Sequence, residues 1–397
     1  MDKNTPIKFG LIAPGLRARA EVVAKTAADN ADSVDSEGRF PAEAFTAARA
    51  QRLLGMMVPP DLGGEGASIS DVADVCYMLG CACASTGMIF AMHQIMVAIL
   101  VRHAQDSSWH RGLLQRLLTE QLLIASSTTE GQTGGDLRSS ECAVEQTGSA
   151  FSFTKSATVM SYGAQADAIL TTARRSVDAP ATDQVLLGLT KEDYQLEPIL
   201  GWQTLGMRGT CSAGFQLKAT GKEEQVLPDS YAIIQSHTMM PVAHLTWGSV
   251  WCGIAAGATE RARRFVRIAA RRAGGQLPPG AAHLTRATMS LRALRGMLAS
   301  ALERFEAISE AKNQLDLLDF QNEMNLLKVN ASEMATAAVM SCMQTCGLSG
   351  YRNDGEFSVS RHLRDVLSAS IMINNDRILA SAAIASPLIE VPSSVRG

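Results

Sequence analysis

The spacing of apolar residues changes twice along the chain, and this change constrains the fold more than any other feature. From Phe40 to about Leu123, apolar residues recur at intervals of three and four, which is typical of helices that bury one face. From about Ala125 the pattern shortens to β-branched or alternating runs separated by Gly, Pro and Asp, as in antiparallel strands. Helical periodicity returns after about His237, in segments near 240–272, 282–310, 317–346 and 359–390.

This order predicts a mixed α and β, multi-domain fold. We expect an N-terminal helical domain (1–124), a middle antiparallel β domain (125–236) and a C-terminal four-helix bundle domain (237–397). A chain of 397 residues is long enough for two or three such units, each with its own core.

Charge and cysteine content narrow the class of protein. The 36 Lys and Arg residues are balanced by 39 Asp and Glu, so we expect no nucleic-acid partner. The apolar stretch 87–101 is interrupted by His93 and Gln94 and is too short to span a membrane. The eight cysteines include no CxxC pair, and the first residues carry no secretion signal. These features predict reduced thiols, no metal site and a cytoplasmic location.

Glycine-rich stretches join the periodic segments. "VPPDLGGEG" (58–66) predicts an ordered loop between two helices. "SSTTEGQTGGD" (126–136) could bind a phosphate or the edge of a heterocycle, or could be a plain turn between domains. It is neither a P-loop nor a Rossmann fingerprint. Taken alone, "LGMRGTCS" (205–212) fits an exposed turn and "QTCGLSGY" (344–351) fits a helix end.

Taken together, these stretches point to a family. With "EFSVSRHLRD" (356–365), they resemble the acyl-CoA dehydrogenases in order and approximate spacing, over about residues 35–390. The resemblance implies the three-domain fold expected above, bound FAD, and assembly as a homodimer or homotetramer. It also implies an acyl thioester substrate, on coenzyme A or an acyl carrier protein, and a possible electron-transfer or carrier-protein partner.

The resemblance also implies roles for particular residues. Gly135 should lie on the thioester side of the flavin, and Arg271 should reach FAD across a subunit interface. The family's Trp-Ile-Thr motif is here Val159, Met160 and Ser161, so a hydroxyl is kept and an indole is lost. The residues expected at the cofactor are Ser126, Thr128, Thr129, Gly134, Val159, Ser161, Arg271, Gln344, Gly347 and Leu348.

The family's catalytic glutamate is missing. By the resemblance it would fall at Ile373, or in some members at Ala243. Two candidate bases lie close by in the sequence. Asp376 could be the base or a solvated residue at a helix end, and His244 could be the base or a buried core histidine. Among their neighbours, Asn374 is expected at the substrate and Asn375 at the flavin.

A run of arginines lies in 260–272. Arg261, Arg264, Arg267 and Arg271 recur at helical spacing, and could meet phosphates or form a solvated face.

The predicted function is an FAD-dependent, acyl-CoA dehydrogenase-like oxidation of an acyl thioester by hydride transfer to flavin N5. Two alternatives remain open. One is a flavin-dependent monooxygenase or oxidase on the same fold, which has no use for the missing carboxylate. The other is a binding subunit that keeps the FAD fold and has lost turnover.

Overall fold

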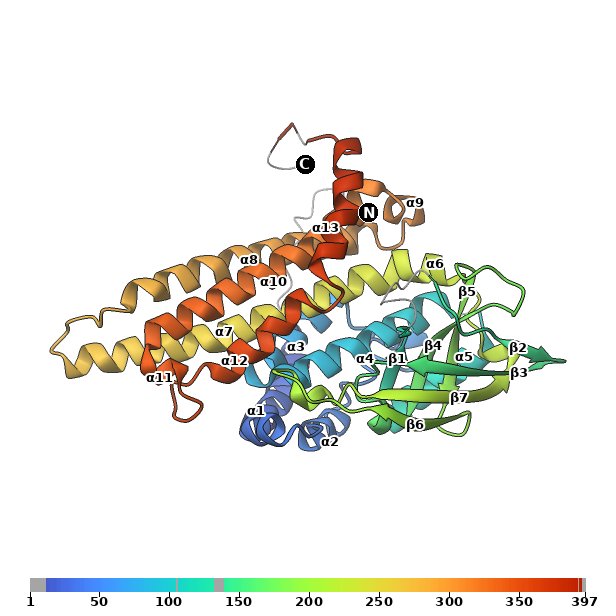
Figure 1. Cartoon of the computed structure of the whole chain (residues 1–397), viewed down its shortest axis with the longest axis horizontal. Helices are drawn as coiled ribbons and strands as arrows, with labels where there is room; N and C mark the ends of the chain where they lie inside the picture. The colour runs from blue at the N-terminus through green and yellow to red at the C-terminus, as the bar shows by residue number, and fades with distance from the viewer. Residues whose placement is uncertain (1–11, 105, 132–138, 392, 395–397) are drawn as a thin grey trace.

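The computed structural model describes residues 12–104, 106–131, 139–391 and 393–394 (Figure 1). Its first part is helical, as predicted. Pro14 begins α1 at a position that needs no amide donor, and Ser68 and Asp71 form a capping box at the start of α3. The loop at 58–66 contains one short 3-10 turn, Pro60–Leu62. The helices of this part are α1 (Pro14–Glu37), α2 (Ala42–Ala50), α3 (Ile69–Ala82), α4 (Ala84–His103) and α5 (Ser108–Glu120).

Helix α4 is the central element of this part. By length and composition, among the described residues, it is a helix that could cross a membrane, but 89% of that window is buried inside the molecule. It packs against α3, α7 and β1, so its apolar residues are covered on several sides. An all-round apolar helix in such a place is a core helix.

The middle part forms two sheets. One has the strand order β1-β4-β5, and the other has the order β2-β3-β7-β6. The pairs are antiparallel, as predicted, except that β1 runs parallel to β4. The strands are β1 (Ile124–Ser127), β2 (Glu145–Thr147), β3 (Ala150–Ala157), β4 (Ala168–Arg174), β5 (Gln184–Thr190), β6 (Tyr194–Leu200) and β7 (Gly214–Lys222).

Three long helices dominate the C-terminal part and form the elongated half of the molecule in Figure 1. The chain is already helical from Tyr231, and a π-helical turn at Gln235–Met239 leads into α7. The predicted helix end at Gly347 is confirmed, with a φ of 55° there. The helices are α6 (Tyr231–Ile234), α7 (Met240–Arg272), α8 (Ala281–Ile308), α9 (Lys312–Leu315), α10 (Leu318–Cys346) and α11 (Leu348–Tyr351).

The last predicted helix, 359–390, is wrong as a single element. The structure divides it into α12 (Ser360–Val366), a 3-10 turn (Leu367–Ser370) and α13 (Asn375–Ala385). The break falls at Ile373, whose φ of 46° is incompatible with a continuing right-handed helix. In Figure 1, α13 leaves the line of α12 and projects away from the bundle.

The β part and the bundle are joined by close backbone contact. A β-carbon on Gly206 would lie 2.1 Å from the carbonyl oxygen of Arg364, so glycine is required there. The neighbouring Met207 amide donates to Asp365 Oδ1 at 2.7 Å. This contact fixes the β6–β7 connection against α12.

Candidate active site

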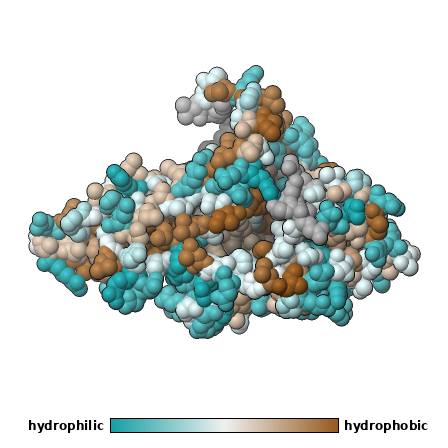
Figure 2. Space-filling model, viewed as in Figure 1, coloured by the Kyte–Doolittle hydropathy of each residue, from teal (hydrophilic) through white to brown (hydrophobic). Residues whose placement is uncertain are grey.

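A cavity of about 730 Å³ lies where the three parts of the chain meet. Its walls come from α4, the segments that follow β1 and β3, the β6–β7 connection, the start of α7, and the chain from α12 to α13. A volume of this size is in the range of binding sites for organic ligands. In Figure 2 apolar atoms gather in a band across this face, over the segment that joins α12 to α13.

One wall of the cavity carries hydroxyl groups. Ser126, Thr128, Thr129 and Ser161 all line it, which places four of the residues predicted at the cofactor in one cavity. The pairing of β1 with β4 sets the position of Ser126. The Thr129 hydroxyl donates to the Val159 carbonyl at 3.1 Å, which ties the two segments together.

The Ser161 hydroxyl is part of a short chain of hydrogen bonds. It shares a hydrogen bond of 2.7 Å with Ser212 Oγ, which in turn shares one of 2.8 Å with Thr210 Oγ1. Thr210 donates onward to the Met207 carbonyl at 2.8 Å. The chain holds the Ser161 side chain in place, while hydroxyl oxygens keep further capacity for a ligand.

The opposite walls are apolar. Met88, Met92 and Met96 lie four residues apart on α4, so they line one stripe of that helix and face the cavity together. Trp247 of α7 also lines the cavity, and its buried Nε1 has no hydrogen-bond partner among the described residues. Such a surface adapts to irregular apolar shapes, because methionine side chains are flexible and polarisable.

The described residues that line the cavity include no Asp, Glu, His, Lys or Cys. Ile373 and Ala243, the two positions where the family resemblance placed a glutamate, both line it. Arg364 is at the rim, but its guanidinium is engaged with the Asp35 carboxylate and the Leu205 carbonyl. Arg377 also lines the cavity. The cavity therefore offers hydroxyls, the Asn374 amide, two guanidinium groups and apolar surface, and its described part holds no Asp, Glu, His, Lys or Cys that could act as a general base.

The two predicted bases lie outside the cavity lining. His244 is fully enclosed between α7 and α10, where its Nδ1 donates to the Met324 carbonyl at 2.8 Å. Burial is the main reason why its pKa falls to about 4. Asp376 is exposed in the first turn of α13, where its amide donates to Asn374 Oδ1 at 2.8 Å. In this structure His244 is thus a buried histidine between two helices, and Asp376 is an exposed residue at a helix start.

Of the two asparagines predicted at the site, one lines the cavity and the other does not. Asn374 lines the cavity and caps α13. Asn375 points into the bundle, where its Oδ1 accepts from Lys328 at 2.7 Å and its Nδ2 donates to Ser332 at 3.0 Å. Asn375 is therefore engaged within the bundle and does not line the cavity.

The residues predicted for the dinucleotide end of FAD lie elsewhere. Arg271 is at the end of α7, and Gln344, Gly347 and Leu348 are where α10 meets α11, all at the far end of the bundle from the β part (Figure 1). Leu348 is 74% exposed. Val159 lines the cavity as predicted, whereas Gly134 and Gly135 lie outside the described residues.

The sequence analysis missed a buried ion pair beside the hydroxyl wall. Lys155 is fully buried, and its ammonium donates to the carbonyls of Ser127 and Thr172 at 2.9 and 2.7 Å. Glu130 lies 3.3 Å from the same ammonium. Burial opposes ionisation of Glu130, but the charge of Lys155 and hydrogen bonds from neighbouring groups keep its pKa below the usual value. Strand alternation was the available signal, because Lys155 shares a face with Phe151 and Phe153.

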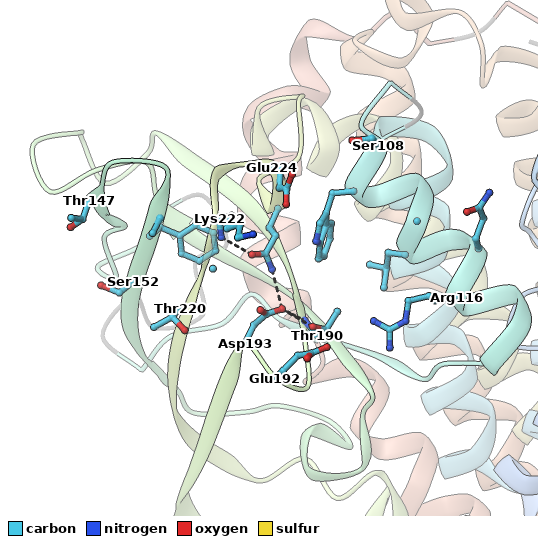
Figure 3. Close-up of a pocket in the computed structure, with 18 of the residues that line it drawn as sticks. Ser108, Arg116, Thr147, Ser152, Thr190, Glu192, Asp193, Thr220, Lys222 and Glu224 are labelled. Atoms are coloured by element: carbon cyan, nitrogen blue, oxygen red, sulfur yellow. Dashed lines mark hydrogen bonds between the residues drawn. The ribbon is translucent and has the colours of Figure 1, made fainter.

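A second cleft lies in the β part, between α5 and the sheet formed by β2, β3 and β7 (Figure 3). Its lining includes none of the predicted site residues. Asp193 already accepts hydrogen bonds from Thr190 and from Gln225 Nε2, the latter at 3.0 Å. The Asp193 carboxylate is thus satisfied by its neighbours, and because several of the predicted site residues gather in the cavity described above, we place the chemistry there.

Two family profiles match the sequence. The acyl-CoA dehydrogenase N-terminal domain matches residues 16–119, and the acyl-CoA dehydrogenase C-terminal domain matches residues 236–380. The chain belongs to the acyl-CoA dehydrogenase family. The resemblance drawn from the five sequence stretches is thereby confirmed, and this family member departs from the pattern at the catalytic glutamate.

Proteins similar to this chain carry several activities by name. An amino sugar nitrososynthase from Streptomyces peucetius is 26% identical over 366 residues, which are 85% of this chain and 84% of that protein. A cyclohex-1-ene-1-carbonyl-CoA dehydrogenase from Syntrophus aciditrophicus is 24% identical over 88% of this chain and 83% of its own length. The FMN-bound dibenzothiophene monooxygenase TdsC of Paenibacillus sp. A11-2 has a TM-score of 0.84 at 17% identity, covering 96% of this chain and 99% of that one. The structural likeness shows a shared fold.

Proposed function

We propose that the protein is a flavin-dependent monooxygenase that transfers an oxygen atom from dioxygen to an apolar organic substrate. The observation that carries this proposal is the cavity lining, in which the described residues provide hydroxyls, apolar surface and two arginines but no Asp, Glu, His, Lys or Cys that could remove a proton from a carbon atom. The acyl-thioester dehydrogenase predicted from the sequence is the second candidate.

The dehydrogenase reaction requires a base in contact with the substrate. Removal of an α-proton as hydride leaves the neighbouring carbon depends on a side chain within hydrogen-bond reach. Ile373 and Ala243 cannot accept a proton, and His244 and Asp376 do not line the cavity. Oxygen transfer to the lone pair of a sulfur or nitrogen atom breaks no carbon–hydrogen bond, so it places no such demand on the protein.

The residues present fit a flavin ring. The hydroxyls of Ser126, Thr128 and Ser161 provide donors and acceptors along one wall, and the methionines of α4 provide an apolar surface opposite. When bound in reduced form, a flavin supplies the electron pair that, with two protons, reduces dioxygen to water and one transferred oxygen atom. The chain's own part is to orient the ring, hold the substrate and keep bulk water out.

The cofactor proposed is FMN. This choice rests on the likeness to an FMN-bound protein of the same fold. In one copy of the chain, the residues predicted for the dinucleotide end of FAD lie at the far end of the bundle from the β part (Figure 1). They could contribute to FAD only from a second copy, as the family resemblance implies, so their position is compatible with either flavin.

Two of the similar proteins support oxygenation, and one supports dehydrogenation. By name, the nitrososynthase and the dibenzothiophene monooxygenase act on nitrogen and sulfur compounds. The cyclohexene-carbonyl-CoA dehydrogenase is the observation that favours the second candidate. Six methionines, two tryptophans and several aliphatic side chains make up most of the lining, so the walls are suited to hold the apolar part of a substrate; the charged side chains among the described lining residues are Arg364, which pairs with Asp35, and Arg377.

The test compares the two reactions on one preparation. The protein is titrated with FMN and with FAD, and binding is followed by quenching of flavin fluorescence. Reduced holoprotein is then exposed to isotope-labelled dioxygen with neutral thioethers and aromatic amines. In parallel, oxidised holoprotein is mixed anaerobically with acyl-CoA thioesters.

We expect label in the thioether or amine product and no bleaching of the flavin's visible band by any thioester. Anaerobic bleaching by a thioester would establish the dehydrogenase instead. Failure to bind either flavin would overturn both candidates and leave the non-catalytic binding subunit.

A further inference from the structure

The bundle contains a lysine that is fully enclosed and has no carboxylate partner among the described residues. Lys328 of α10 has 0% of its surface exposed. Its ammonium donates to the Ile373 carbonyl at 3.0 Å and to Asn375 Oδ1 at 2.7 Å. The Trp251 ring, with its centroid 5.8 Å from Nζ, covers another side. Burying an ammonium costs desolvation free energy, which its hydrogen bonds must offset. The acceptors of these hydrogen bonds therefore indicate what the lysine is there to hold.

Both acceptors belong to the turn where the last predicted helix breaks. Ile373 has a φ of 46°, in the left-handed region that β-branched residues avoid. This conformation turns its carbonyl into the bundle toward Lys328, although the carbonyl would otherwise continue the helix. Strained backbone of this kind persists only where surrounding contacts hold it.

The same turn forms one wall of the candidate active site. Ile371, Met372, Ile373 and Asn374 all line the cavity. Asn374 caps α13, and the adjacent Asn375 is anchored to both Lys328 and Ser332. One hydrogen bond of Lys328 therefore ends on the backbone of the wall at Ile373, the other ends on the Asn375 side chain beside it, and the ammonium itself stays outside the cavity.

We propose that Lys328 is a positioning residue, which holds the 371–374 turn in its left-handed conformation and so sets the shape of the cavity wall that faces the substrate. It acts through backbone geometry and does not touch the reacting atoms. The part of this inference that concerns substrate rests on the proposed function. The part that concerns the turn does not.

A plain space-filling role makes a different prediction from a positioning role. Lys328→Met keeps the length of the side chain and removes the donors, whereas Lys328→Gln keeps an N–H donor. If the residue only fills space, both variants should behave like the wild type. If the N–H donors hold the turn, residues 371–374 should lose their conformation in the methionine variant and largely keep it in the glutamine variant.

The direct measurement is hydrogen exchange, followed by mass spectrometry, on peptides that cover 367–378. In Lys328→Met, the amides of this turn should exchange roughly tenfold faster, since a charge-assisted hydrogen bond and the strained turn it supports are lost. Peptides from α8 should be unchanged. Adding Ile373→Asn to Lys328→Met should restore much of the protection, because asparagine tolerates the left-handed conformation.

The consequence for the cavity is measured by titration with dibenzothiophene as an apolar probe, with tryptophan fluorescence as the signal, since Trp202 and Trp247 both line the cavity. In Lys328→Met the probe should bind roughly fivefold more weakly, and in Lys328→Gln by less than about twofold. Equal exchange in the 367–378 peptides of Lys328→Met and wild type would overturn the proposal. So would equal protection in the single variant and the Ile373→Asn double variant.

The two failures can be told apart. If the wild type does not bind the probe, the proposed substrate class is wrong, and the exchange experiment still decides the role of Lys328. If probe and FMN both bind but Lys328→Met changes neither exchange nor probe binding, the role of Lys328 is wrong and the proposed function stands.

Discussion

Replacing Lys155 by methionine should strongly destabilise the β part of the chain. Lys155 donates to the carbonyls of Ser127 and Thr172 and lies 3.3 Å from Glu130 Oε1. Its side chain is fully buried and that of Glu130 is 7% exposed, so little water can replace the lost ammonium. Removing one member of a buried ion pair costs about 3–5 kcal/mol, because the remaining charge is left uncompensated.

The magnitude can be bounded from the remaining contacts. Glu130 would still accept from Ser140 Oγ at 2.5 Å and from the amides of Glu141 and Cys142 at 2.9 and 3.2 Å. These three donors soften the loss, so we expect the lower end of the range, about 3 kcal/mol. That is roughly a hundredfold change in the opening equilibrium of the strands that Lys155 joins.

The assay is native-state hydrogen exchange of the amides in β1 and β4. Lys155→Met should accelerate their exchange roughly a hundredfold, and Glu130→Gln in the same chain should recover part of it. The matched control is Lys218→Met, which breaks the exposed pair with Glu197 and should change stability by about 1 kcal/mol or less. If Lys155→Met behaves like this surface control, or if the two buried substitutions add without coupling, the reasoning is refuted.

Three further outcomes are expected. Burial lowers the pKa of Lys328 from 10.5 to about 8, so the folded chain releases this proton before the unfolded chain does. The free energy of unfolding of the wild type relative to Lys328→Met, measured by thermal unfolding, should therefore rise by on the order of 3 kcal/mol from pH 8 to 10.5. The facing His244, with a pKa of about 4, stays neutral over this range and does not contribute. A difference that stays constant with pH would contradict the prediction. Burial raises the pKa of Asp365 to about 6, so the folded chain holds this proton more tightly than the unfolded chain does. The free energy of unfolding of the wild type relative to Asp365→Asn should therefore fall as the pH rises from 4 to 6, again measured by thermal unfolding. Ser161→Ala should weaken FMN binding roughly fivefold through loss of one hydrogen bond, as measured by fluorescence quenching, whereas the exposed control Ser156→Ala should not.

Periodicity predicted the order of helical and β parts because each part must bury its own apolar face. It failed at 371–374, where the local pattern is helical but the backbone is held by Lys328, 45 residues before Ile373 in the chain. A hydrogen bond from a distant helix leaves no trace in local spacing. Tertiary contact overrode the local preference at this one turn.

The candidate site was predictable where residues follow strand ends. Ser126, Thr128, Thr129 and Ser161 converge on the cavity because the segments after β1 and β3 lie side by side. His244 lies outside the cavity lining for a geometric reason. Successive helical residues are turned by about 100°, so Ala243 and Trp247 face the cavity while His244 faces α10.

The position of α4 in the core has a consequence for how the chain is made. Helix α4 ends at His103, whereas α7, which covers part of it, begins at Met240. During synthesis, the twenty-residue apolar segment of α4 leaves the ribosome long before α7, which packs against it, has been made. A nascent or truncated chain that stops short of α7 should therefore bind chaperones and aggregate, whichever reaction the finished protein performs.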